Sequence, residues 1–386
     1  MDTEVMNEAI EVAKSLISIP NVHTVSKVVT ELLVDKGVSV SKLTYKNLPI
    51  VIARLEGHNS EKPILLTTHM DVASPGPLSL WHYPPFSASL IEDKLYGRGS
   101  VDAKGGLASA IVALRRLASD NMKIKRNILL LALPDGEEGY KSLSVVKELK
   151  GCSAIVIEPT LSISAWVAPI ICTAQLGGAY IEVEIKGTPS HVSTSWCAEN
   201  PLMSVTKVFS IVGELWPYHS LYPTRPGVAS EDLLSAFLPG LPTIVPVKVQ
   251  TRGKAHSTPE SVRVRIYSTL PPNYTANDVI ERLSARLEIE NASIKVVEEI
   301  PFFMEDANAD IVKSVYDAVR EVTGVHPLYE WFPWPTAAHI LKAHGVANEV
   351  LIMGPGSFRL AHRPNEYVNV NDLVSVIKIF MKVAGG

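Results

Sequence analysis

The stretch Leu95-Tyr-Gly-Arg-Gly-Ser-Val-Asp-Ala-Lys-Gly-Gly106 is the most informative part of this chain. It predicts a glycine-rich loop that leads into a helix, because Leu107, Ile111 and Leu114 recur at helical spacing. The glycines around Asp102 indicate a tightly folded backbone that directs this carboxylate at another group. Glycine-rich turns before helices also bind phosphates, but neither G-x-x-x-x-G-K-S/T nor G-x-G-x-x-G is present, so no motif supports a nucleotide enzyme.

Three short apolar runs predict buried strands that each end in acidic or histidine residues. His69 follows the run 64–68, Glu137 and Glu138 come shortly after the run 127–133, and Glu158 follows the run 154–157. Two predicted helices separate these strands: one starts near Asp102, and the other covers Ser142 to Leu149. Strands that alternate with helices indicate an α/β domain, in which functional groups gather at the carboxyl ends of the parallel strands.

The pattern changes after about residue 174. The segment Ala179 to Ile185 alternates with period two, which predicts a strand with one exposed face. The elements expected after it are a helix over 201–215, a Pro- and Gly-rich loop over 217–242, strands over 243–250 and 261–267, a helix over 275–287 and a strand over 292–298. This split βαβ order predicts an inserted ferredoxin-like α+β domain over 175–301, a lid or dimerisation domain. Residues 1–174 and 302–386 would form the catalytic, metal-binding domain, a phosphorylase/hydrolase-like mixed sheet between helices, with an aromatic loop at Trp331 to Pro335.

Composition restricts the functional classes. The 386 residues carry a formal net charge of −4, so the chain lacks the basic character typical of nucleic-acid binding. Its three cysteines are scattered, and no apolar run reaches the length of a membrane span. The N-terminus lacks the basic and apolar segments of a signal peptide. We therefore expect a cytoplasmic protein that binds neither membranes nor nucleic acid.

Two imidazoles and three carboxylates at the ends of different elements predict a metal centre. The proposed ligands are His69, Asp102, Glu138, Glu158 and His362, a donor set that suits zinc, cobalt or manganese. A carboxylate can bridge two ions about 4 Å apart, which then hold a water and a polarised carbonyl. We expect Asp102 to bridge, with His69 and Glu158 on one ion and Glu138 and His362 on the other.

Two further acidic residues are assigned catalytic roles. Asp71 lies two residues beyond His69, so on an extended segment it shares a face with the imidazole and can fix its orientation. Glu137 precedes Glu138, and adjacent side chains point apart, so both should not bind one ion. Glu137 is the better general base.

These residues lie in motifs that resemble the M20 family of metallopeptidases and amidohydrolases. His69-Met-Asp-Val72 is similar to the first family signature, and the stretch Leu95 to Gly106 is similar to the second. Glu137-Glu138-Gly139 resembles the acidic pair, and Glu158-Pro-Thr160 the third ligand segment. Gly354-Pro-Gly356, Ala361-His362 and Asn365-Glu366-Tyr367-Val368 resemble the C-terminal signature, so the matches run along the chain in the family's order.

The resemblance implies the same ligands, with Asp102 bridging, Glu137 as general base and Asp71 as orienting acid. It also implies a cis peptide bond between Asp102 and Ala103. The segment Lys186-Gly-x-x-Ser-His191 resembles a family motif whose histidine reaches the partner subunit's active site and stabilises the oxyanion. A homodimer with two divalent ions per subunit, most often zinc, is therefore expected.

Three segments depart from the family pattern. Gly136 stands where an Asp usually precedes the acidic pair. Trp334 to His339 replaces a Gly-Gly-x-Asp-like segment, and Leu241 to Ile244 with Arg263 to Tyr267 differs from a segment that helps to hold a substrate carboxylate in many members. Arg252, Arg263 and Arg265 are candidate carboxylate ligands, because a guanidinium binds a carboxylate through two hydrogen bonds; the alternative for each is a solvated surface position.

The expected activity is metal-dependent hydrolysis of an amide bond in an N-acyl amino acid or a short peptide with a free carboxylate. A deacetylase or desuccinylase is favoured, and a carboxypeptidase or dipeptidase is the alternative. A catalytically silent metal-binding or oligomeric relative is a hypothesis of a different class, against which the retained Glu137 argues.

Overall fold

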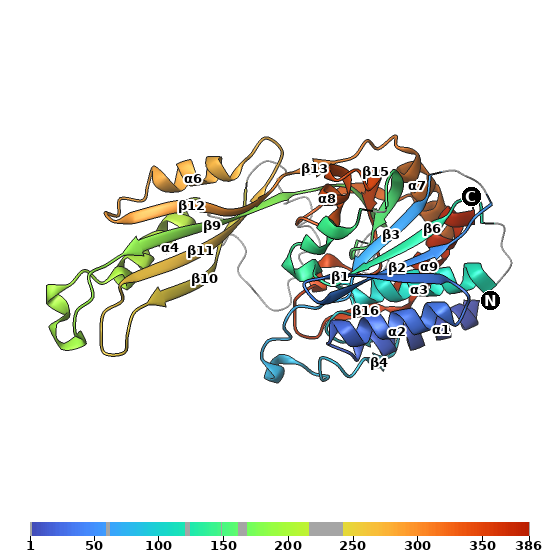
Figure 1. Cartoon of the computed structure of the whole chain (residues 1–386), viewed down its shortest axis with the longest axis horizontal. Helices are drawn as coiled ribbons and strands as arrows, with labels where there is room; N and C mark the ends of the chain where they lie inside the picture. Colours follow the sequence, from blue (N-terminus) through green and yellow to red (C-terminus); the bar gives the residue numbers. More distant parts are fainter. Residues whose placement is uncertain are drawn as a thin grey trace. The chain divides into compact units, whose positions relative to one another are not determined.

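A computed structural model describes residues 2–58, 62–119, 124–147, 149–160, 168–215 and 242–385. The chain divides into two compact units (Figure 1). Unit 1 comprises Met1–Gln175, Met304–Phe332 and Thr336–Gly386, and unit 2 comprises Leu176–Phe303 with Pro333–Pro335. The loop predicted over 217–242 lies, except for Pro242, outside the described residues. None of the described helices combines the length and hydrophobicity that a membrane crossing requires.

A mixed sheet forms the centre of the described part of unit 1, with strand order β1-β2-β6-β3-β7-β15-β8-β13 and β14 paired with β8. The strand β3 lies parallel to both β6 and β7, and β7 lies parallel to β15. The strands are β1 (Ser39–Tyr45), β2 (Leu48–Leu55), β3 (Ile64–His69), β6 (Ile128–Leu133), β7 (Cys152–Val156), β8 (Ile170–Gln175), β13 (Phe303–Met304), β14 (Leu328–Phe332) and β15 (Ala347–Ile352). The three predicted apolar strands are therefore adjacent, in the order β6-β3-β7.

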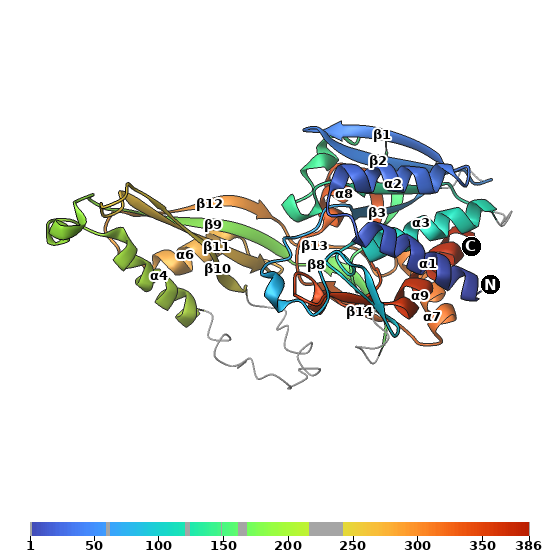
Figure 2. The same cartoon turned by 90° about the horizontal axis from the view of Figure 1, so that it is seen from below.

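Helices pack against this sheet and enclose the main hydrophobic core. The helices of unit 1 are α1 (Asp2–Ile17), α2 (Val22–Val34), α3 (Lys104–Ser119), α7 (Asp310–Thr323), α8 (Ala337–Ala343) and α9 (Val370–Gly385). The helices α1, α3 and α9 lie side by side in Figure 2, and α3 packs against both α1 and α9. Leu107, Ile111 and Leu114 of α3 are fully buried in this core, as their helical spacing predicts. The strands β4 (Ser89–Ile91) and β5 (Lys94–Tyr96), which precede the Asp102 loop, form a small sheet with β16 (Tyr367–Asn369).

Unit 2 contains a four-stranded antiparallel sheet in the order β10-β11-β9-β12. Its elements are β9 (Gly177–Lys186), α4 (Pro201–Leu215), β10 (Ile244–Arg252), β11 (Ser261–Leu270), α6 (Ala276–Ser284) and β12 (Ala292–Ile300). Ile181, Val183 and Ile185 of β9 are buried in one core with apolar residues of α4 and α6. The order strand, helix, strand, strand, helix, strand matches the predicted ferredoxin-like arrangement.

Two local predictions differ from the structure, and one buried strand was missed. The helix expected from Ser142 is a 3₁₀ helix, η3 (Lys141–Val145). The aromatic loop expected at Trp331 begins instead within β14, which ends at Phe332 because Pro333 and Pro335 cannot donate to a strand ladder. The strand β8, all of whose residues are buried, was not predicted.

Candidate metal centre

The site lies at the carboxyl ends of the three adjacent strands. His69 is the last residue of β3, and Glu158 follows β7 by two residues. Glu137 lies in a 3₁₀ turn, η2 (Gly136–Glu138), that follows β6. Asp102 precedes α3, and His362 comes from the loop before β16. Parallel strands end at one edge of the sheet, which explains why residues so distant in sequence meet.

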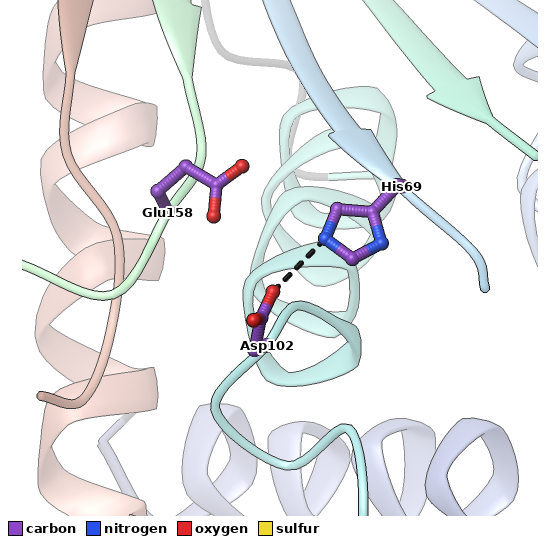
Figure 3. A group of neighbouring side chains, drawn as sticks. All are labelled: His69, Asp102 and Glu158. Atoms are coloured by element: carbon purple, nitrogen blue, oxygen red, sulfur yellow. Dashed lines mark hydrogen bonds and ion pairs between the residues drawn. The ribbon is translucent and has the colours of Figure 1, made fainter. Parts of the chain in front are cut away.

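Asp102 connects two groups of potential ligands. Its Oδ1 lies 3.0 Å from Nε2 of His69, and its Oδ2 lies 3.2 Å from Nε2 of His362. One group is His69, Asp102 and Glu158 (Figure 3), and the other is Asp102, Glu137 and His362; within each group the ligand atoms lie within 4.8 Å of one another. Because each oxygen of Asp102 faces a different imidazole, the geometry fits a carboxylate that bridges two ions. The peptide bond between Asp102 and Ala103 is cis.

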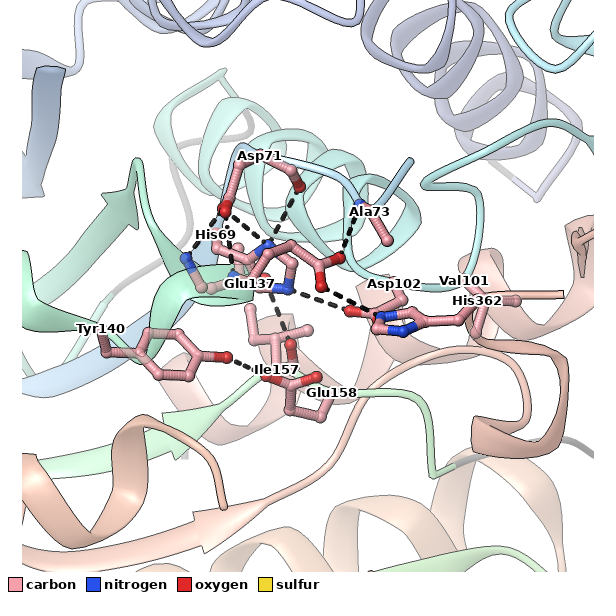
Figure 4. Close-up of polar contacts among 12 residues, drawn as sticks. His69, Asp71, Ala73, Val101, Asp102, Glu137, Tyr140, Ile157, Glu158 and His362 are labelled. Carbon is pink, nitrogen blue, oxygen red and sulfur yellow. Dashed lines mark hydrogen bonds and ion pairs between the residues drawn. The ribbon is translucent and has the colours of Figure 1, made fainter. Parts of the chain in front are cut away.

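Asp71 orients both His69 and the turn that carries Glu137. Its Oδ1 lies 3.1 Å from Nδ1 of His69, so the other ring nitrogen, Nε2, faces Asp102. The two carboxylate oxygens of Asp71 also accept the backbone N–H groups of Gly136 and Glu137, at 2.8 and 2.9 Å. Figure 4 shows these contacts. Asp71 thus lies where an orienting acid is expected.

Only one member of the acidic pair belongs to a ligand group among the described residues. Glu137, proposed as the base, belongs to the second ligand group, and its Oε2 lies 3.1 Å from Nε2 of His362. Glu138, proposed as the ligand, is exposed and belongs to neither group found among the described residues. Contacts with the segment after β3 set this arrangement: Asp71 fixes the turn, and the N–H of Ala73 donates to Oε1 of Glu137 at 2.8 Å, which directs Glu137 into the site.

The remaining predicted residues lie in unit 2. His191 is exposed and its Nδ1 lies 2.6 Å from Oγ of Ser193. Each proposed arginine has a carboxylate neighbour: Arg252 lies 3.4 Å from Glu260, Arg263 lies 2.9 Å from Glu184, and Arg265 lies 3.3 Å from Glu182. The pairs of Arg263 and Arg265 lie within their own sheet, whereas Glu260 directly precedes β11.

The charges of the site favour cation binding. Burial alone would lower the pKa of His69, but its hydrogen bonds to Asp102 and Asp71 raise this pKa well above the ordinary value. Hydrogen bonds to Asp102 and Glu137 raise the pKa of His362 to about 10. Burial, together with the charge of Asp102, raises the pKa of Glu158 to about 8. The clustered carboxylates raise the pKa values of the nearby imidazoles because they favour positive charge. A divalent cation bound at this site would be stabilised by the same carboxylates.

Sequence reasoning missed a buried ion pair that supports the Asp102 loop. Arg98 donates from Nη1 to Oε2 of Glu366, and both side chains are almost completely buried. Oε1 of Glu366 accepts the backbone N–H groups of Val101 and Asp102, at 2.8 and 3.1 Å. Both residues lie in motifs already singled out, Tyr96-Gly-Arg-Gly99 and Asn365-Glu366, but nothing local to either motif reveals that they pair.

The comparisons with known proteins agree with this geometry. The family model described as peptidase family M20/M25/M40 matches residues 65–385, and the chain belongs to this family of metallohydrolases. The family and the fold predicted from the motifs are thereby confirmed.

Individual relatives are distant but span the whole chain. A succinyl-diaminopimelate desuccinylase of Methylobacillus flagellatus is 24% identical over 383 residues, which cover 95% of this chain and 96% of the relative. Among solved structures, an M20 family metallo-carboxypeptidase of Sulfolobus solfataricus has a TM-score of 0.76 at 20% identity, with 99% and 98% of the two chains covered. A di-peptidase of Saccharomyces cerevisiae has a TM-score of 0.79 at 16% identity, covering 100% and 98%. These likenesses support the fold and leave the substrate open.

Proposed function

We propose that this protein hydrolyses the amide bond of an N-acyl amino acid or short peptide, with two divalent ions held on either side of Asp102. The observation that carries the proposal is the pair of ligand groups that share Asp102. Imidazole nitrogens and carboxylate oxygens are the donors that zinc accepts in hydrolytic sites, and cobalt or manganese also suits them. Bound there, the ions would polarise the substrate carbonyl and lower the pKa of a water molecule.

The chain's own residues position this chemistry and move the proton. Asp71 holds His69 in the orientation that presents Nε2 to the site. We assign Glu137 the role of general base: it would accept the proton of the attacking water and deliver it to the leaving amine. Its Oε1 is held by the N–H of Ala73, which leaves Oε2 directed toward His362 and Asp102.

The variants Glu137→Gln and Glu138→Gln separate the two roles of the acidic pair. If Glu137 is the base and Glu138 a ligand, Glu137→Gln retains two ions and loses activity, while Glu138→Gln loses one ion. If Glu137→Gln loses an ion and Glu138→Gln retains two, Glu137 is the ligand and the assignment of the base is wrong. Metal content by mass spectrometry, measured beside turnover, gives the answer.

We propose that His191 stabilises the oxyanion in the active site of a partner subunit. Two features of unit 2 support a homodimer: α4 exposes the apolar side chains of Leu202, Met203 and Phe209, and Val247 and Val249 are exposed on the edge strand β10. Exposed apolar groups and unpaired strand edges commonly mark subunit interfaces.

Subunit complementation tests this arrangement. His191→Ala and Glu137→Gln chains are each expected to be inactive, but a mixed dimer would combine an intact metal centre from the first chain with His191 from the second. Mixing the two variants after dissociation is therefore expected to restore part of the wild-type turnover. If the mixture stays inactive although mixed dimers are detected, His191 does not act in the partner's site.

The favoured substrate class is an N-acetyl or N-succinyl amino acid, supported by the end-to-end match to a desuccinylase. A carboxypeptidase or dipeptidase activity is the alternative, supported by the carboxypeptidase and di-peptidase folds. Metal-stripped protein restored with zinc, cobalt or manganese would be assayed against N-acyl amino acids, dipeptides and carboxypeptidase substrates. Turnover of the N-acyl compounds supports the favoured class, and turnover of the peptides alone supports the alternative. No turnover with two bound ions supports the silent relative.

A further inference from the structure

Tyr140 is a buried residue beside the metal centre that neither the motifs nor the proposed mechanism uses. It follows Gly139 directly, and its φ of 56° places it in the left-handed region, which is uncommon for a residue with a bulky side chain. The backbone N–H of Tyr140 donates to the carbonyl oxygen of Asp135 at 2.9 Å, which closes the turn after the acidic pair. This conformation directs the phenol ring inward.

The ring of Tyr140 contacts two residues of the same ligand group. Its hydroxyl donates to Oε1 of Glu158 at 2.6 Å (Figure 4), and its ring lies edge-on to the imidazole of His69, with centroids 6.0 Å apart and an interplanar angle of 80°. Tyr140 therefore contacts both partners of Asp102 in the first group. Among the described residues, these contacts link the turn after β6 to the ends of both β3 and β7.

We infer that Tyr140 is a positioning residue that makes Glu158 bind its metal ion through one oxygen only. The inference rests on the proposed dinuclear function. A carboxylate that binds a cation is ionised and only accepts hydrogen bonds, so the tyrosine hydroxyl donates to Oε1 and leaves Oε2 for the ion. Partners of this kind fix the orientation of a metal ligand and raise metal affinity. A ligand that uses a single oxygen also preserves an open position, which catalytic zinc sites require.

The variant Tyr140→Phe removes the hydroxyl and retains the ring against His69. We expect the affinity of the metal-stripped protein for zinc to fall about 10- to 100-fold. With cobalt as the probe, we expect weaker visible absorption, because a second oxygen of Glu158 would raise the coordination number. Tyr316→Phe is the matched control: its hydroxyl also has a partner, Nδ1 of His326 at 2.9 Å, but it contacts none of the proposed ligands. This control should bind zinc and cobalt as the wild type does.

A double-mutant cycle with Glu158→Gln shows whether Tyr140 acts through Glu158. If it does, Tyr140→Phe causes little further loss of zinc affinity once Glu158 is replaced. An equal loss in both backgrounds overturns the inference, as does a Tyr140→Phe protein with wild-type zinc affinity and cobalt spectrum. If the wild type itself binds no metal, the proposed function fails; if it binds two ions and Tyr140→Phe is indistinguishable from it, only the inference about Tyr140 fails.

Discussion

At the scale of single residues, the contact between position 136 and His69 explains why Gly136 stands where the family usually has an Asp. A Cβ atom at this position would lie 2.3 Å from Cγ of His69, so no side chain fits unless the imidazole moves. The absence of a side chain lets the η2 turn pass directly against a proposed metal ligand. The glycine in place of the usual Asp is therefore a steric requirement of this site and no sign of a lost function.

Replacing Gly136 by Ala should displace His69 and weaken zinc binding about 10- to 100-fold, the loss typical of a disturbed metal ligand. Isothermal titration of metal-stripped protein measures the change. Gly213→Ala is the matched control, because a Cβ at Gly213 in α4 meets no atom within 4 Å. Wild-type zinc affinity in Gly136→Ala would show that the contact with His69 does not constrain position 136.

The buried pair of Arg98 and Glu366 is the second decisive contact at this scale. Glu366→Ala would leave Arg98 as an uncompensated buried charge and remove the acceptor of two backbone N–H groups. We expect a loss of about 3–5 kcal/mol in the free energy of unfolding, measured by urea denaturation. Glu31→Ala, which removes an exposed ion pair with Lys27, should cost less than about 1 kcal/mol. Equal costs for the two variants would contradict the structural role of the pair.

At the scale of elements, the sheet of unit 2 places two of the three proposed substrate-binding arginines in cross-strand ion pairs. Arg265 and Lys295 stand opposite Glu182 in the registers of β11 and β12 with β9, and Arg263 stands opposite Glu184. Period-two alternation places these charges on the face opposite the apolar core. Arg263 and Arg265 thus form cross-strand ion pairs, and sequence alone could not supply the register that forms them.

Glu182 makes this arrangement testable through pH. Burial would raise its pKa, but the hydrogen bonds from Lys295 and Arg265 lower it below the ordinary value. A carboxylate with a lowered pKa stabilises the fold above its unfolded pKa of about 4.3, and this stabilisation is lost as the pH falls through the folded value. Glu182→Gln should therefore be less stable than the wild type by about 1 kcal/mol at pH 7.

Thermal unfolding of both proteins from pH 7 downward measures this difference, which should shrink below about pH 4. The exposed Glu288→Gln is the control and should follow the wild type at every pH. A difference that stays constant, or grows toward low pH, would show that ion pairing at Glu182 does not stabilise unit 2.

At the scale of the whole molecule, hydrophobic pattern and motif order predicted the architecture and most of the ligands, but not the individual contacts. Hydrophobic periodicity located α3 and the elements of unit 2, because each buries one face, and continuous apolar runs located the three parallel strands, which are buried throughout. The motifs located His69, Asp102, Glu158 and His362, which the structure brings into two groups.

What sequence could not predict depends on contacts between distant segments. Which of Glu137 and Glu138 faces the site is set by Asp71, some 65 residues earlier in the chain. Tyr140 acts on Glu158, and Arg98 pairs with Glu366. The sequence around Tyr140 or Arg98 does not reveal either partner. The last residues of β14 were predicted as a loop, because prolines follow them directly in the sequence.

The central claim is that Asp102 joins two metal positions, and the metal content of the Asp102→Asn and His362→Ala variants tests it most directly. After saturation with zinc and removal of free metal, the wild type should hold two ions per chain and His362→Ala should hold one. Asp102→Asn should bind zinc at both positions more weakly than the wild type does. Two tightly bound ions in Asp102→Asn, or a single ion in the wild type, would contradict a dinuclear centre bridged by this carboxylate.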